Sequence, residues 1–144
     1  MNAPATTTQP RRVLRSVGAV MAGLVANIVL SGATDAALHA TGIYPPMFRP
    51  MADQLWALAL AYRVVFAVVG GFLTARIAPA RPMRHVLVLL GIGAALGVLG
   101  ALANWNKGPE FGPHWFSIGI VVTGAASTWL GGVLYADQRA RMKP

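Results

Sequence analysis

Four long apolar runs constrain this chain more than any other feature. They cover residues 13–38, 55–77, 86–103 and 115–136. A helix needs roughly 20 residues to cross the hydrocarbon core of a bilayer. It also satisfies its own backbone hydrogen bonds where no water is present. The sequence therefore predicts an all-α membrane protein in which four transmembrane helices form a bundle.

The composition supports a membrane location and excludes several function classes. Only 11% of the 144 residues are charged, whereas soluble domains carry about 25%. The chain has no cysteine, which excludes disulfides, thiol catalysis and cysteine-ligated metal sites. Its net charge of +8 lies in short clusters between the apolar runs, a pattern typical of membrane topology rather than of nucleic-acid binding. We expect the lipid bilayer as a partner, with a homodimer or another membrane protein as a further one, and no nucleic acid.

The charge clusters also predict how the chain is oriented. Nine basic residues lie near the two chain ends or near the connection between the second and third apolar runs, whereas only two lie in the other two connections. The nine are Arg11, Arg12, Arg15, Arg76, Arg81, Arg84, Arg139, Arg141 and Lys143. Basic residues concentrate on the cytoplasmic side of bacterial membrane proteins. We therefore expect a protein of the bacterial cytoplasmic (inner) membrane with both termini in the cytoplasm.

The predicted organisation is one transmembrane domain with a tail at each end. Residues 1–12 are polar and rich in Thr and Pro, which predicts a disordered cytoplasmic tail. The transmembrane domain covers residues 13–136, and residues 137–144 form a second cytoplasmic tail. The first run is long for a signal peptide and lacks a clear cleavage site, so we expect it to be retained as a helix.

Small residues predict how the helices pack. The third run contains Gly91, Gly93, Gly97 and Gly100, and the fourth contains Gly124, Thr128 and Gly132. Small residues let membrane helices approach closely, so we expect the third helix to pack on the fourth, with a homodimer interface as the alternative. The pairs Gly70-Gly71 and Gly131-Gly132 also recur at matching places, which is compatible with two parallel hairpin repeats.

Four polar residues of the first predicted helix form a stripe on one side, and the second predicted helix contains one charged residue with which this stripe could interact. Asn27, Ser31, Asp35 and His39 are spaced four residues apart, which places them on one face of a helix. Arg63 lies within the second run, and its guanidinium stays charged. The side chains of antiparallel neighbours at these depths lean toward each other, which predicts an Asp35–Arg63 ion pair. This pair could lock two helices together or line a site open to the periplasm, and the remaining alternative is that Arg63 extends to the lipid headgroups.

The two connections on the expected periplasmic side complete a candidate site. Residues 40–50 and 104–115 combine Pro and Gly with aromatic residues, and proline restricts the backbone, so we expect ordered loops near the end of the polar stripe. The predicted ligand-binding residues or polar core are Asn27, Ser31, Asp35, His39, Tyr44, Arg63, Asn104, Glu110 and His114.

The sequence predicts no cofactor and assigns no catalytic residue. His39 and His114 could ligate a haem, or a metal ion together with Asp35 or Glu110, but they lack a recognised ligand spacing. The chain has no nucleophile elbow, P-loop or dinucleotide fingerprint. Haem or metal binding through the two histidines is therefore kept only as an alternative.

Several segments resemble those of small four-span bacterial inner-membrane proteins of unassigned function. These segments are residues 33–39 (ATDAALH), 42–46 (GIYPP), 61–63 (AYR), 81–85 (RPMRH) and 104–114 (NWNKGPEFGPH). The resemblance spans about residues 15–137 and implies the inner membrane and the four-span layout, but no activity. The favoured interpretation is a non-enzymatic protein that binds a partner or a ligand. The alternatives are a dimeric small transporter or channel, and a membrane enzyme or a haem or metal protein.

Overall fold

The computed structural model describes residues 9–142 and is built from four long helices. These are α1 (Gln9–Ala40), α2 (Asp53–Ile77), α3 (Pro82–Asn104) and α4 (His114–Arg141), with a short 3-10 helix, η1 (Pro109–Phe111), before α4. Each of the four long helices is long and apolar enough to cross a membrane. Over the described residues the chain contains no strand. The prediction of an all-α protein with four membrane-spanning helices is confirmed.

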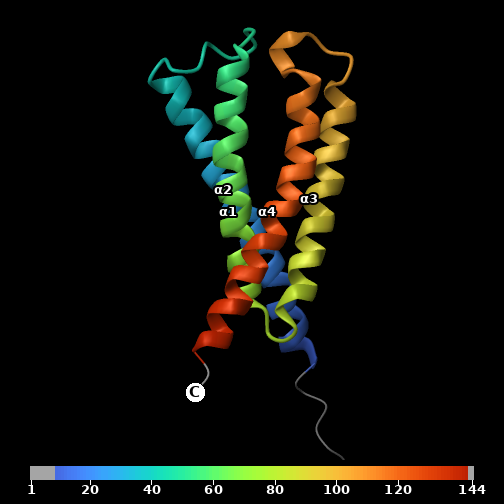
Figure 1. Ribbon diagram of the computed structural model, residues 1–144. Helices are drawn as coiled ribbons and strands as arrows, with labels where there is room; N and C mark the ends of the chain where they lie inside the picture. Colours follow the sequence, from blue (N-terminus) through green and yellow to red (C-terminus); the bar gives the residue numbers. More distant parts are fainter. Residues whose placement is uncertain (1–8, 143–144) are drawn as a thin grey trace, which may run out of the picture.

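The helices form two hairpins that cross near their middles. Figure 1 shows α1 with α2 and α3 with α4, spreading apart toward the end that holds the α1–α2 loop and η1. We call this the loop end. The opposite end, which holds the start of α1, the end of α4 and the α2–α3 connection, is called the terminal end. The two hairpins therefore meet at a waist and diverge toward the loop end.

Glycines fix the place where the hairpins cross. A side chain at Gly71 would clash with the backbone of Thr128, and one at Gly131 would clash with the backbone of Val68. Within the first hairpin, Gly23 lies against Gly70 in the same way. Because a hydrogen atom replaces a side chain at these points, the helix backbones come into direct contact.

The glycines of α3 contribute less to packing than we predicted. α3 does pack along α4, but among its glycines only Gly97 has a neighbouring chain, Val121, in the space where a side chain would lie, while Gly91, Gly93 and Gly100 face open space. Gly93 and Gly100 lie on the same helix face as Gly97, and only Gly91 lies on another. The shared face is therefore not sufficient for close packing, because a neighbouring helix approaches it only at Gly97. The close backbone contacts belong to α2 instead, and the homodimer interface and the hairpin repeat stay predictions.

The helices also extend beyond the predicted boundaries. Residues 9–12, which we assigned to the tail, belong to α1, and α4 continues through residues 137–141. An ion pair one turn apart, Arg141 Nε to Asp137 Oδ2 at 2.9 Å, supports this last part of α4. Hydropathy marks where an apolar segment ends, whereas a helix can continue into water on polar residues. Residues 1–8 and 143–144 of the predicted tails lie outside the described residues.

Candidate functional site

Asp35 of α1 and Arg63 of α2 form the predicted ion pair. Arg63 Nη2 lies 2.6 Å from Asp35 Oδ2. Arg63 Nη1 donates to the Tyr62 hydroxyl at 2.9 Å and to the carbonyl oxygen of Ala59 at 3.2 Å. The side chains of Arg63 and Asp35 remain 27% and 31% exposed, so the pair lies at a surface within the bundle rather than in a sealed core.

Tyr62 holds the second carboxylate oxygen. Its hydroxyl donates to Asp35 Oδ1 and lies 3.3 Å from the hydroxyl of Tyr44. Tyr44, which lies in the α1–α2 loop and is 4% exposed, donates in turn to the carbonyl oxygen of Leu55 at 3.3 Å. Tyr62 was not among the predicted site residues, although a phenol within an apolar run normally needs a hydrogen-bond partner and Arg63 is its neighbour.

Two aromatic rings, those of Tyr62 and Phe116, lie against the Arg63 guanidinium. Arg63 Cζ lies 5.1 Å from the centre of the Tyr62 ring and 5.9 Å from that of Phe116 on α4, within the range of a cation–π contact. Phe116 is buried together with Tyr44 and Ala59. The ion pair of the first hairpin is thereby linked to the second hairpin.

The polar stripe of α1 lies on one face, as predicted. Ser31 Oγ donates to Asn27 Oδ1 at 3.3 Å. His39 Nδ1 lies 2.8 Å from the carbonyl oxygen of Asp35, to which it donates when that nitrogen is protonated. The His39 ring also lies nearly perpendicular to the Tyr44 ring, with 5.3 Å between their centres, so the stripe continues into the loop.

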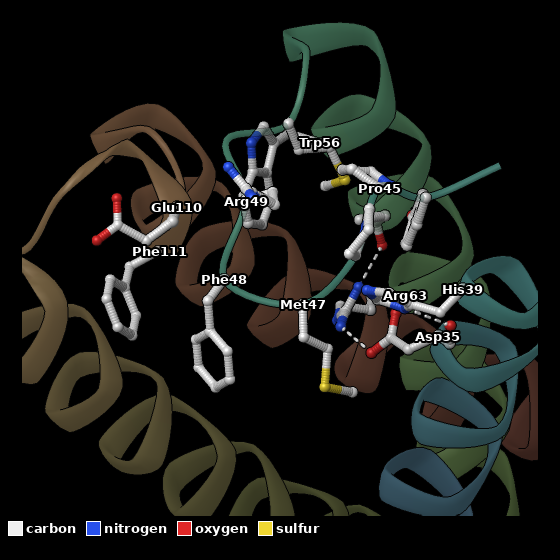
Figure 2. A pocket seen from close by; sticks show the side chains of 14 residues that line it. Asp35, His39, Pro45, Met47, Phe48, Arg49, Trp56, Arg63, Glu110 and Phe111 are labelled. Carbon is white, nitrogen blue, oxygen red and sulfur yellow. Dashed lines mark hydrogen bonds and ion pairs between the residues drawn. The ribbon is translucent and has the colours of Figure 1, made fainter. Parts of the chain in front are cut away.

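A cavity of about 300 Å³ opens beside the ion pair at the loop end. We call it the loop cavity, and Figure 2 shows its lining. The lining residues are Asp35, His39, Tyr44, Pro45, Pro46, Met47, Phe48, Arg49, Met51, Trp56, Ala59, Arg63, Glu110 and Phe111. In Figure 2, Met47, Phe48 and Phe111 point to the same side, while the Glu110 carboxylate points away from Arg63. The cavity therefore combines an ion pair on one wall with large apolar side chains on the others.

A second cavity, of about 390 Å³, lies deeper between α1, α2 and α4. We call it the helix cavity; its polar lining consists of Asn27, Ser31, Asp35, Arg63 and Thr123. It shares Asp35 and Arg63 with the loop cavity. A small cavity of about 90 Å³ then shares Asn27 and Gly124 with it and reaches Thr128 at the waist. The three cavities are thus neighbours that share lining residues, from the loops to the helix crossing.

Two predicted site residues lie elsewhere. Asn104 accepts a hydrogen bond from Lys107 Nζ at 3.0 Å. His114 Nε2 lies 2.9 Å from the carbonyl oxygen of Trp105, and its ring stacks on the Trp105 ring at 4.2 Å. Neither residue lines the loop cavity or the helix cavity, so the structure does not bring His114 into one cavity with His39. Between residues 9 and 142 no three metal-ligating side chains gather in one place.

The site can hold a molecule that has both a polar and an apolar part. The ion pair and the hydroxyls offer donors and acceptors on one wall, and aromatic and methionine side chains offer contact area on the others. Fold and site together define a four-helix membrane protein with a polar cluster that lines two neighbouring cavities. Comparison of the chain with protein-family models, curated proteins and solved structures found no match.

Proposed function

We propose that this chain is a non-enzymatic protein of the bacterial inner membrane that binds an amphipathic ligand in the loop and helix cavities. The observation that carries the proposal is the position of the Asp35–Arg63 pair, which forms part of the wall of both cavities. An ion pair that only locked two helices would be expected to have packed side chains around it. Charged groups at membrane depth usually face a partner or a wet cavity, and often mark a functional site.

Size and chemistry agree with a ligand site. Small-molecule sites have about 300–1,000 Å³ and combine mostly apolar walls with a few polar groups, and the two cavities measure about 300 and 390 Å³. Met47 and Phe48 at the loop cavity are 69% and 77% exposed, which leaves apolar surface for a chain or ring of the ligand. The polar end of the ligand would then meet Asp35, Arg63 and Ser31.

The closed waist supports binding rather than conduction. Below the small cavity, Gly71 and Gly131 bring the backbones of α2 and α4 into contact. A pore would need a path past this contact, whereas a binding site needs one open end. The positive clusters at the terminal end support a cytoplasmic location for that end, so we propose that the cavities open to the periplasm.

Native mass spectrometry of the purified protein tests this function. We expect bound amphipathic molecules on the wild-type protein, and their loss from the charge-neutral double variant Asp35→Asn/Arg63→Gln. Gly100→Ala, in open space on α3, is the matched control and should keep them. Equal retention by the double variant, or a wild-type protein with no bound molecule, would refute the proposed function.

A further inference from the structure

A further hollow lies at the opposite end of the molecule and is lined mostly by apolar side chains. It measures about 360 Å³ and lies between the first part of α1 and the first part of α3. Its lining consists of Ser16, Val17, Val20, Met21, His85, Val88 and Ile92. Val17 and Val88 are 56% and 53% exposed, so this hollow is a groove that opens outward, and we call it the apolar groove.

Arginines continue both walls of the apolar groove toward the terminal end. Arg12 precedes Ser16 by four residues on α1, and Arg84 precedes Val88 by four residues on α3. Residues four apart lie on the same helix face, one turn above the other, so each arginine extends one wall by a turn. Arg81 directly precedes α3 in a left-handed backbone conformation, and its carbonyl oxygen lies 3.4 Å from His85 Nδ1. All three arginines are exposed.

Protein carboxylates do not neutralise this charge. Arg15 donates to the carbonyl oxygen of Ile77 at 3.2 Å, which directs it to the α2–α3 connection. The one carboxylate that the structure describes at this end, Asp137, pairs with Arg141. Arg12, Arg81 and Arg84 therefore form a positive rim beside an apolar groove.

We infer that the apolar groove binds one anionic phospholipid. An acyl chain lies along Val17, Val88 and Ile92, and the phosphate lies against Arg84 and Arg12, with Arg81 and His85 beside it. Basic residues next to a groove between membrane helices are suited to anionic headgroups, and each contributes about 1 kcal/mol near the surface, which corresponds to about fivefold in affinity. This site is separate from the loop and helix cavities and does not depend on the proposed function.

The test is a lipid titration of the detergent-solubilised protein, followed by native mass spectrometry. Dioleoylphosphatidylglycerol should bind more tightly than dioleoylphosphatidylcholine, because only the first has a net negative charge. Arg84→Gln should weaken phosphatidylglycerol binding about fivefold. Arg139→Gln on α4 removes the same charge at the same end away from the groove, and it should leave binding unchanged. Val88→Trp, which fills the groove without changing the charge, should also weaken binding.

Three results would overturn the inference. If Arg84→Gln and Arg139→Gln weakened phosphatidylglycerol binding equally, the lipid would be attracted by the overall positive charge of this end and not by a specific site. If phosphatidylglycerol and phosphatidylcholine bound equally tightly, the arginines would not contribute to lipid binding. If glycerol phosphate competed for the site as strongly as unlabelled phosphatidylglycerol does, the site would bind the phosphate alone and would not use the apolar groove. If Val88→Trp fails to fold, the comparison of the two arginine variants decides the question.

Discussion

Arg63 of α2 reaches Asp35 of α1 with 2.6 Å between Nη2 and Oδ2, and the preceding residue, Tyr62, donates to the other carboxylate oxygen. Two consecutive residues of one helix thus hold both oxygens of a carboxylate on its neighbour. The Arg63 guanidinium in turn lies near Phe116 of the second hairpin. The Asp35–Arg63 pair is thereby held in the wall that the loop cavity and the helix cavity share.

Removing either charge should destabilise the protein. Exposed ion pairs contribute about 0–1 kcal/mol and breaking a buried pair costs about 3–5 kcal/mol. Because this pair is about one-third exposed, we expect Asp35→Ala and Arg63→Ala each to cost about 2 kcal/mol. The double variant should cost less than the sum, which thermal melts of all four proteins can measure. Strict additivity would mean that the two residues do not interact.

The hydroxyl of Tyr62 should contribute on its own. Tyr62→Phe keeps the ring and removes the donor to Asp35, and hydrogen bonds to charged groups contribute about 1.5–3 kcal/mol. Tyr135→Phe is the matched control, because Tyr135 packs its ring on Phe72 far from the site and should change stability by less than about 0.5 kcal/mol. If the two variants had equal melting temperatures, the hydrogen bond from Tyr62 to Asp35 would not contribute to stability.

The waist should tolerate no side chain. Gly71→Ala and Gly131→Ala each place a methyl group against the backbone of the facing helix. Overpacking typically costs about 1–3 kcal/mol, and the backbone atoms here have little room to move. Gly100→Ala, which meets open space, should be neutral or slightly stabilising. Thermal melts would contradict this account if all three variants behaved alike.

The sequence predicts the helices and the ion pair of this protein well, because both follow from strong local rules. A run of apolar residues has few alternatives in a membrane, and a lone Arg63 needs a partner such as Asp35. The role of Tyr62 depends on which face of α2 meets α1, and no local rule gives that rotation. Asn104 and His114 are the helix-end residues that flank the α3–α4 connection, and their side chains contact Lys107 and Trp105 of that connection. Their position at the same end of the bundle was therefore not enough to place them in the site.

Reporter fusions test the proposed orientation. We expect a phosphatase fused after Lys107 to be active, because this enzyme folds in the periplasm. Fusions after Ala80 or at the C-terminus should be inactive, since the proposed orientation places these basic segments in the cytoplasm. An active C-terminal fusion would overturn the proposed orientation of the helices.

Single-cysteine labelling in whole cells tests the central claim, that the polar cluster faces a hollow open to water at the loop end. The chain has no cysteine of its own, so each introduced thiol reports alone. Ser31 lines the helix cavity, whereas Thr74 is fully buried and Leu99 lies on the outer surface of α3 at 62% exposure. The three variants are Ser31→Cys, Thr74→Cys and Leu99→Cys. We predict that a membrane-impermeant charged thiol reagent modifies Ser31→Cys and neither control. A Ser31→Cys thiol as unreactive as the one at Thr74 would show that Asp35 and Arg63 form a closed lock and line no open site.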